Sequence, residues 1–337
     1  MEETSKTGPG CSCGTVTPRV VPDRKGGTVL AIVCPGQGSQ TPGFLAPWLE
    51  VPAFRERLES LSDVAGLDLV AHGTTSDAET IKDTAVAQPL IVGAGLATAA
   101  VLLPDGPART VGVTAGHSVG EITAAAFAGV LSDHDAMVFV RARGAGMAAA
   151  SAVTPTGMSA VLGGDPTEVS AVLERHGLTA ANANGAGQTV AAGTLDQLAA
   201  LAADPPAKAR VIPLQVAGAF HTTHMAPAVA ALDELSQGFA VSDPGVTLLS
   251  NRDGAPVTDG PEALSRLVQQ VSNPVRWDLC MQTMVEQGVT TLIELSPAGT
   301  LVGLAKRGMP GVTTLAVKTP DDLAAAQQLI SDDAQEA

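Results

Sequence analysis

The sequence predicts a mixed α/β fold in which a small domain is inserted into a larger one. Buried strands alternate with helices through most of the chain, which is typical of a parallel sheet covered by helices on both faces. Between residues 157 and 214 the order changes to β-α-β-β-α-β, the split βαβ arrangement of ferredoxin-like folds. We therefore expect a larger α/β domain at residues 28–151 and 216–330 and a small ferredoxin-like domain at residues 152–215.

The larger domain is predicted from short apolar runs that alternate with longer Ala-rich or amphipathic stretches. Its expected strands occupy residues 29–33, 111–114, 247–250, 291–295 and 314–317. Its expected helices occupy residues 54–61, 89–103, 133–150, 226–237 and 275–287, and further helices start near residues 121, 299 and 320. In the small domain we expect strands at 158–162, 178–183, 188–192 and 210–214, with helices at 166–176 and 195–203.

Composition and charge argue against several classes of protein. The formal net charge is −15 and the pI is near 4.7, so the long-range field repels nucleic acid and anionic membrane surfaces. Neither is an expected partner. The sequence shows no run of about 18 apolar residues, so no membrane span is expected. Aromatic residues make up only 2% of the chain, so the core must be built mainly from Ala, Val and Leu.

The N-terminal segment and the cysteines favour a reducing compartment. Residues 1–27 lack the basic and apolar regions of a signal peptide, and we expect them to form a disordered N-terminal tail. The cysteines, at positions 11, 13, 34 and 280, show no paired spacing of the zinc-ribbon or thioredoxin kind. A cytoplasmic location is therefore expected.

The sharpest local signal is Gly116-His117-Ser118-Val119-Gly120, a G-x-S-x-G between a predicted strand and a predicted helix. Such a tight bend needs small residues on both sides of the serine, and it leaves the hydroxyl exposed at the helix N-terminus. There the backbone N–H of Val119 can point at a developing oxyanion, with the helix dipole assisting. We predict that Ser118 is a nucleophile, although a simple βα turn gives the same pattern.

A serine hydroxyl needs a base to remove its proton, so a histidine from elsewhere in the chain must approach Ser118. His117 adjoins the serine, but its side chain is expected to point away. His221 and His224 follow the last strand of the small domain, where a loop can deliver an imidazole to the strand ends at which α/β sites gather. The H-x-x-H spacing also fits a metal site, but no acidic or Cys partner lies nearby, so no metal is expected.

Arg143 stands out because it lies on the apolar stripe of the predicted helix 133–150. It is three or four residues from Phe139, Val140 and Met147. A buried arginine needs an anionic partner. That partner is either an internal carboxylate such as Glu121 or the free carboxylate of a bound substrate, held by a bidentate pair. The pattern alone does not distinguish the two.

With these residues identified, the chain resembles malonyl-CoA:acyl carrier protein transacylases and the acyltransferase domains of polyketide synthases, from about residue 29 to residue 317. The shared motifs are Pro35-Gly36-Gln37-Gly38-Ser39-Gln40, Gly116-His117-Ser118-Val119-Gly120-Glu121, Arg143, Gly218-Ala219-Phe220-His221 and Asn273-Pro274-Val275-Arg276-Trp277. Five motifs in the right order are far more specific than any one of them.

The resemblance implies an α/β-hydrolase-like core and a set of catalytic roles. Ser118 would be acylated and His221 would be its base. Gln270 would orient His221 through a carbonyl, so no triad aspartate is expected. The backbone N–H groups of Gln37 and Val119 would form the oxyanion hole.

The same resemblance implies residues that bind the substrate. Arg143 would bind the malonyl carboxylate, and Asn182 would line the substrate channel. Phe220 would fill the space that an α-methyl group on the substrate needs, which favours malonyl over methylmalonyl groups. Gly218 departs from the family pattern at this selectivity motif.

The implied function is transfer of the malonyl group from malonyl-CoA to the phosphopantetheine thiol of acyl carrier protein, through a malonyl-serine intermediate, in type II fatty acid synthesis. The coenzyme A thioester is a substrate, no cofactor is expected, and we expect a monomer. Docking of an acidic carrier protein needs a local basic patch, for which the candidates are Lys208, Arg210, Arg276, Lys306 and Arg307. A discrete polyketide acyltransferase, a serine thioesterase or esterase, and a non-catalytic binding module remain alternatives.

Overall fold

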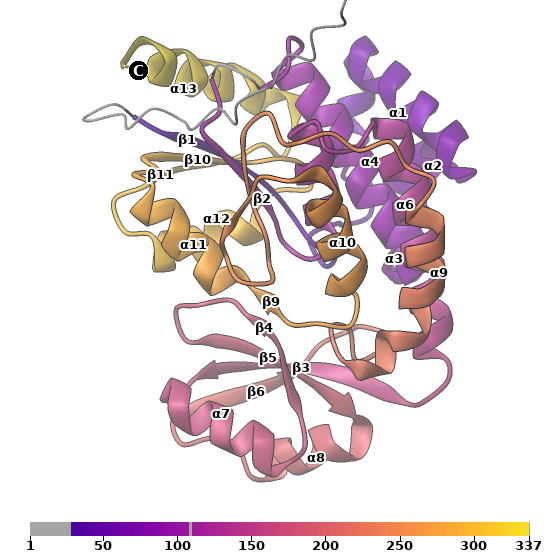
Figure 1. Cartoon of the computed structure of the whole chain (residues 1–337), viewed down its shortest axis with the longest axis vertical. Coiled ribbons are helices and arrows are strands. Elements are labelled where there is room, and N and C mark those ends of the chain that lie inside the picture. Colours follow the sequence, from indigo (N-terminus) through magenta and orange to yellow (C-terminus); the bar gives the residue numbers. More distant parts are fainter. Residues whose placement is uncertain (1–27, 108–109, 337) are drawn as a thin grey trace, which may run out of the picture.

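The computed structural model describes residues 28–107 and 110–336, in which the chain forms two sheets (Figure 1). The predicted disordered tail at residues 1–27 lies outside the described residues. The first sheet has the strand order β11-β10-β1-β2-β7-β8, with five parallel strands and β8 antiparallel to β7. These strands are β1 (Leu30–Cys34), β2 (Val113–Gly116), β7 (Thr247–Leu249), β8 (Pro256–Val257), β10 (Thr291–Glu294) and β11 (Thr313–Ala316).

Helices cover both faces of the first sheet, as the sequence predicts. Leu30, Ile32 and Cys34 of β1 belong to the core on one face, whereas Ala31 and Val33 belong to the core on the other, because successive side chains of a strand point to opposite faces. The first face is covered by α1 (Pro52–Ala65), α4 (Thr84–Leu102), α5 (Gly120–Phe127) and α6 (Asp133–Ser151), and the second by α11 (Trp277–Glu286) and α12 (Thr300–Gly308) (Figure 1).

The second sheet has five strands in the order β6-β3-β5-β4-β9. Its elements include β3 (Thr156–Gly163), α7 (Pro166–Arg175), β4 (Thr179–Ala183), β5 (Gln188–Thr194), α8 (Leu195–Ala203) and β6 (Ala209–Pro213). Their order along the chain matches the predicted β-α-β-β-α-β pattern, and the neighbouring pairs among these four strands are antiparallel. Side chains of α7 and α8 pack with Val161 and Ala191 in a separate apolar core on one face of this sheet.

The fifth strand of the second sheet comes from a distant part of the sequence. β9 (Val275–Arg276) pairs in parallel with β4, and α11 begins only at Trp277. The prediction of a helix from residue 275 is therefore wrong for its first two residues. Their backbone pairs with Asn182 and Ala183 in the register of β4, so tertiary pairing overrides the local helical pattern.

The remaining helices surround these layers. They are α2 (Leu69–Thr74), α3 (Ala78–Lys82), α9 (Ala226–Ser236), α10 (Gly260–Gln270) and α13 (Leu323–Glu336), with short 3₁₀ turns at Pro47–Glu50, Thr223–Met225 and Pro320–Asp322. Helix α10 was not predicted, although the sequence contains an N-terminal capping signal for it. The side chain of Asp259 accepts a hydrogen bond of 2.8 Å from the backbone N–H of Glu262, and Pro261 lies in the first turn.

Helix α4 starts earlier than predicted, at Thr84 instead of Pro89. The Asp83 side chain caps it by accepting a hydrogen bond of 2.8 Å from the N–H of Ala85. Pro89 then lies inside the helix and has no N–H to donate to the Ala85 carbonyl. The Arg141 guanidinium of α6 donates to that carbonyl instead, at 3.3 Å. A neighbouring helix thus satisfies the group that the proline leaves without a partner.

Helix α4 also bears on the expectation that the chain has no membrane span. Thr84–Leu102 is long and apolar enough to cross a membrane by length and composition, and it is the one such helix in the residues that the structure describes. The expectation that the sequence contains no apolar run of this length is therefore wrong. Buried residues make up 78% of its most apolar window, which is the environment of a core helix in a globular protein.

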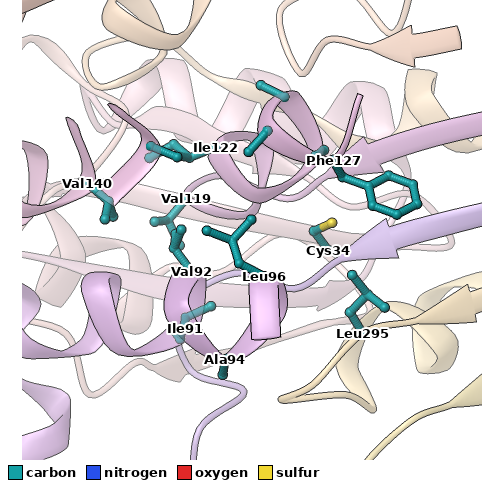
Figure 2. Close-up of a cluster of buried hydrophobic side chains, with 14 of the residues drawn as sticks. Cys34, Ile91, Val92, Ala94, Leu96, Val119, Ile122, Phe127, Val140 and Leu295 are labelled. Carbon is teal, nitrogen blue, oxygen red and sulfur yellow. The ribbon is translucent and has the colours of Figure 1, made fainter. Parts of the chain in front are cut away.

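The core between α4, α5 and the first sheet is mostly aliphatic, as the composition predicts. Figure 2 shows Val92 and Leu96 of α4 close to Val119 and Ile122 at the start of α5. The two helices approach closely because α4 carries Gly95, where an added Cβ would lie 2.8 Å from a methyl group of Thr123. Small and branched side chains thus replace aromatic rings as the means of filling this layer.

Replacing Gly120 with alanine tests this close packing. Its Cβ would lie 2.2 Å from the carbonyl oxygen of Cys34, and backbone atoms on both sides cannot move apart easily. We expect Gly120→Ala to lower the free energy of unfolding by about 1–3 kcal/mol or more, measured by urea denaturation.

Gly303→Ala in α12 is the matched control, because no atom lies within 4 Å of a Cβ built there. It should raise stability by about 0.5–1 kcal/mol through helix propensity alone. Equal effects of the two substitutions would contradict the described packing.

Candidate active site

Ser118 lies on a sharp bend between β2 and α5. β2 ends at Gly116, two residues later than the predicted strand, and α5 begins at Gly120. The backbone φ of Ser118 is +54°, a left-handed conformation that costs about 1–3 kcal/mol for a residue other than glycine. A Cβ on Gly116 would lie 1.9 Å from the carbonyl carbon of Gly120. The bend therefore closes only because glycine occupies position 116.

The predicted nucleophile and base are brought together. Ser118 Oγ lies 2.7 Å from Nε2 of His221, and the His221 side chain is buried. The loop after β6 delivers this histidine: the N–H of Ala219 donates to Thr156 Oγ1 at 3.0 Å, and the N–H of His221 donates to the carbonyl of Val271 at 3.2 Å. Like Ser118, His221 has a left-handed backbone, with a φ of +60°.

The hydrogen bonds of His221 fix which ring nitrogen carries its proton. Nδ1 lies 2.9 Å from the backbone carbonyl oxygen of Gln270, and a carbonyl oxygen only accepts hydrogen bonds. The proton of the neutral ring is therefore on Nδ1, and Nε2 presents a lone pair to the Ser118 hydroxyl. The family resemblance implies an orienting carbonyl at Gln270, and the contact observed is with its backbone carbonyl.

The surroundings of His221 keep its imidazole neutral. Burial lowers the pKa of His221 from its usual 6.5 to about 3, and the nearby positive charge of Arg143 acts in the same direction. The hydrogen bond to the Gln270 carbonyl only partly opposes these effects. Across the physiological pH range the ring can therefore accept a proton from Ser118.

Arg143 is almost completely buried and faces the same hydroxyl. Its Nη2 donates to Gln270 Oε1 at 2.6 Å and lies 3.5 Å from Ser118 Oγ, while Nη1 donates to Gln88 Oε1 at 2.7 Å. Burial lowers the pKa of Arg143 to about 10, opposed by the charge of Glu121, so the guanidinium stays positive at neutral pH. Its hydrogen-bonding partners are neutral groups.

Glu121, the internal carboxylate considered as a partner for Arg143, is reached only through Gln270. In the described residues no ion pair joins Glu121 and Arg143. Glu121 Oε1 accepts from the N–H of Asn251 at 2.6 Å, and Oε2 accepts from Gln270 Nε2. Burial raises the pKa of Glu121 to about 7, although both hydrogen bonds and Arg143 act to lower it. The carboxyl is therefore poised between its neutral and ionised forms near neutral pH.

The predicted oxyanion donors flank the serine. Val119 directly follows Ser118, and the loop that carries Gln37 packs against the bend, since a Cβ on Gly36 would lie 2.7 Å from the carbonyl oxygen of His117. Within the described part of the chain, the backbone N–H groups of Gln37 and Val119 donate no hydrogen bond. Both amides are thus available to an incoming oxygen.

Two further predicted residues lie nearby but do not contact the serine by hydrogen bonds. Asn182 of β4 and Phe220 are both buried, and Phe220 packs in the main apolar core. Asn184, which directly follows β4 of the second sheet, contacts the bend through His117: its Oδ1 lies 2.8 Å from Nε2 of His117. His117 therefore supports the bend from the side, which agrees with the prediction that its ring points away from the nucleophile.

Sequence reasoning missed Asn251 and Gln88. Asn251 is fully buried and contacts the bend through its side chain, with Nδ2 donating to the Gly116 carbonyl at 2.7 Å and Oδ1 accepting from the Ser118 N–H at 2.8 Å. A signal for it exists, because Asn251 directly follows a predicted buried strand at the carboxyl edge of a parallel sheet. Gln88 lies within an apolar helix, where only its contact with Arg143 reveals its role.

A cavity of about 340 Å³ adjoins Gln270 and is lined partly by Glu121, Arg266 and Arg276. Each of these arginines already pairs with a carboxylate, Arg266 with Asp253 and Arg276 with Asp278. In the residues covered by the structure, no group of three or more His, Cys, Asp or Glu side chains is arranged to hold a metal ion.

The basic residues proposed for docking do not form one patch. Lys208 and Arg210 lie at or beside β6, whereas Arg276 lies on β9, at the opposite edge of the second sheet. Arg307 contacts the middle of this sheet instead: its Nη2 donates to Gln188 Oε1 at 3.2 Å, and Gln188 begins the central strand β5, two strands from either edge. Lys306 adjoins Arg307.

Comparison with known proteins is consistent with this geometry. An acyl transferase domain matches residues 31–321. A malonyl CoA-acyl carrier protein transacylase of Mycobacterium tuberculosis is 53% identical over 301 residues, which cover 88% of this chain and 98% of that protein.

Solved structures agree. The crystal structure of MCAT from Mycobacterium tuberculosis superposes with a TM-score of 0.86 at 52% identity and covers 89% of this chain and 99% of that chain. A malonyl-transacylase solved in complex with a type II polyketide synthase acyl carrier protein superposes with a TM-score of 0.84 at 30% identity and covers 90% of this chain and 100% of that chain. The chain belongs to the acyl transferase family, among the malonyl CoA-acyl carrier protein transacylases.

Proposed function

We propose that this protein transfers the malonyl group of malonyl-CoA to the phosphopantetheine thiol of acyl carrier protein, through an ester on Ser118, and that it serves type II fatty acid synthesis. The observation that carries the proposal is the environment of one oxygen. Ser118 Oγ lies 2.7 Å from Nε2 of a neutral His221 and 3.5 Å from the charged Arg143. A nucleophile and a carboxylate-binding group thus meet at one point.

In the first half-reaction, His221 Nε2 takes the hydroxyl proton while Ser118 Oγ attacks the thioester carbonyl carbon. The tetrahedral intermediate collapses, the carbon–sulfur bond breaks, and the proton on Nε2 passes to the departing coenzyme A sulfur. The products are malonyl-Ser118 and free coenzyme A. Because the Gln270 carbonyl holds Nδ1–H throughout, the imidazolium that forms briefly is stabilised in place.

The second half-reaction runs the same steps in reverse order. The phosphopantetheine thiol gives its proton to His221 Nε2 and attacks the ester carbonyl. Ser118 then leaves as the hydroxyl, taking the proton back. In both halves, the N–H groups of Gln37 and Val119 would stabilise the oxyanion, since neither has a partner in the described structure.

Arg143 would select the malonyl group. A guanidinium buried among neutral amides is charged but lacks an anion, and the free carboxylate of malonate supplies one. An acetyl group offers no such partner and would leave the cation uncompensated. We assign to Phe220 and Asn182 the supporting roles of restricting α-substituents and lining the channel, because both are buried, Phe220 directly precedes His221, and Asn182 is two residues from Asn184, which contacts His117.

The parallel sheet with its serine bend supports an α/β-hydrolase-like core, formed by residues 28–151 and 216–330. The β3-α7-β4-β5-α8-β6 order supports a ferredoxin-like subdomain at residues 152–215, to which β9 adds a strand from outside. We further propose that the enzyme is a cytoplasmic monomer without a cofactor. Its acidic carrier protein would dock over exposed basic side chains, for which Lys208, Arg210, Lys306 and Arg307 are the candidates.

Intact-protein mass spectrometry tests the intermediate. After incubation with malonyl-CoA, the wild-type chain should carry one malonyl group, which persists in buffer and disappears when holo acyl carrier protein is added. Ser118→Ala should carry none, and His221→Ala should acylate orders of magnitude more slowly, since the two residues act as a unit. Rapid loss of the adduct in buffer alone would identify a thioesterase instead.

Arg143→Ala should erode the preference for malonyl-CoA over acetyl-CoA. We expect the ratio of the two acylation rates to fall by about 10–100-fold, because a charge-assisted hydrogen bond contributes about 1.5–3 kcal/mol. Arg141→Ala, on the same helix but bonded to the Ala85 carbonyl, should keep the wild-type ratio. An unchanged ratio in Arg143→Ala would reject the carboxylate-binding role.

The pH dependence of Ser118 acylation tests the neutral base. His221 works only when unprotonated, so lowering its pKa to about 3 keeps it active in acid. Single-turnover acylation should show no loss centred near the usual histidine pKa of about 6.5. Arg143→Ala removes a cation that lowers the pKa of His221, so the acid limb of this variant's pH–rate profile should move to higher pH. If the acid limb of the wild-type profile were centred near the ordinary histidine pKa of about 6.5, His221 would be exposed to solvent and not buried.

A further inference from the structure

The side chain of Asn251 contacts the serine bend through two hydrogen bonds to its backbone. We infer that Asn251 is a positioning residue that holds the Ser118 bend in its reactive conformation. This inference rests on the proposed function, because it concerns the same nucleophile. Asn251 is fully buried, and both polar atoms of its side chain are bonded to the bend, so it acts through Ser118 and not on the substrate.

The side chain of Asn251 continues a strand ladder beyond the point where the strands separate. β2 pairs with β7 only at Val113 and Thr114. Beyond them, Nδ2 of Asn251 donates to the Gly116 carbonyl and Oδ1 accepts from the Ser118 N–H. The side-chain amide therefore pairs with the backbone on both sides of residue 117, as a neighbouring strand would.

This pairing requires one donor and one acceptor at a fixed separation. Asparagine has both on a short side chain. Aspartate in its ionised form has two acceptors and would face the Gly116 carbonyl with a negative charge. Leucine has neither group. The chemistry of position 251 is thus specified by the two backbone groups that it spans.

The backbone of Asn251 is held at both ends, so its side chain cannot turn away. Its N–H donates to Glu121 Oε1 at 2.6 Å, and its carbonyl accepts from the N–H of Arg276 at 2.7 Å. Through these bonds the bend is tied to α5 on one side and to β9 on the other. The direction of the next amide, that of Val119, follows from the same bend.

The experiment compares Asn251→Leu and Asn251→Asp with the wild type by single-turnover acylation with malonyl-CoA, at a temperature where circular dichroism shows each variant folded. We expect Asn251→Leu to lower the acylation rate constant by about 100-fold, the scale for losing one oxyanion contact, with KM for malonyl-CoA changed less than about 3-fold. Thr98→Val, which removes a buried hydrogen bond to the Ala94 carbonyl inside α4, is the control and should lower Tm without slowing acylation.

The Asn251→Asp variant tests the same role independently, and it does so even if Asn251→Leu does not fold. A protonated aspartic acid regains a donor for the Gly116 carbonyl, so the activity of this variant relative to wild type should rise as the pH falls. Glu121 and Cys280 are the titratable side chains in contact with residue 251, and the wild-type profile measured in parallel accounts for their titration. A merely structural residue would give a flat ratio.

The outcomes separate the two proposals. A wild-type chain that forms no malonyl-Ser118 would overturn the proposed function. A wild type that acylates, together with a folded Asn251→Leu that acylates at the same rate, would overturn only the role of Asn251. A flat ratio for Asn251→Asp across the pH range would do the same.

Discussion

Two ionisable side chains of opposite kinds, Glu121 and Arg143, are buried in the centre of this protein, and the side-chain amide of Gln270 lies between them. Its Nε2 donates to Glu121 and its Oε1 accepts from Arg143, while its backbone carbonyl holds His221. Burying either charge without a partner would cost several kcal/mol. One residue at the end of α10 therefore makes both charges tolerable and orients the base, and the rest of the site is arranged around it.

This arrangement suits Arg143 to its proposed role in selecting malonyl groups. Had it paired directly with Glu121, a substrate carboxylate would have to compete with an internal one. Because neutral amides of Gln88 and Gln270 satisfy only part of its hydrogen-bonding capacity, the positive charge is kept without being neutralised. The energetic cost of burying this charge is recovered when an anion binds, which is how a binding site differs from an ion pair within a core.

Much of the fold and site could be read from the sequence because the signals are local. The serine bend, the apolar run of β1 and the order from β3 to β6 all follow from residues adjacent in the chain. Apart from α10, whose capping signal is local, what sequence reasoning missed depends on distant contacts. Asn251 reaches the serine bend only because β7 lies beside β2. β9 forms only because β4 leaves an edge with which its backbone can pair. Pro89 is tolerated inside α4 because Arg141 donates a hydrogen bond to the carbonyl that the proline leaves without a partner. Side chains that serve a distant backbone leave no periodic pattern.

The two-residue strand β9 limits how the molecule can open. It belongs to the second sheet through β4, yet the Arg276 N–H is hydrogen-bonded to the carbonyl of Asn251 beside the serine, and α10 ends at Gln270, five residues before β9 begins. Swinging the second sheet away as a rigid unit would pull on both the nucleophile and the residue that holds its base. A rigid-body hinge between the two sheets is therefore disfavoured, because opening it would strain the contacts that hold Ser118 and His221 together.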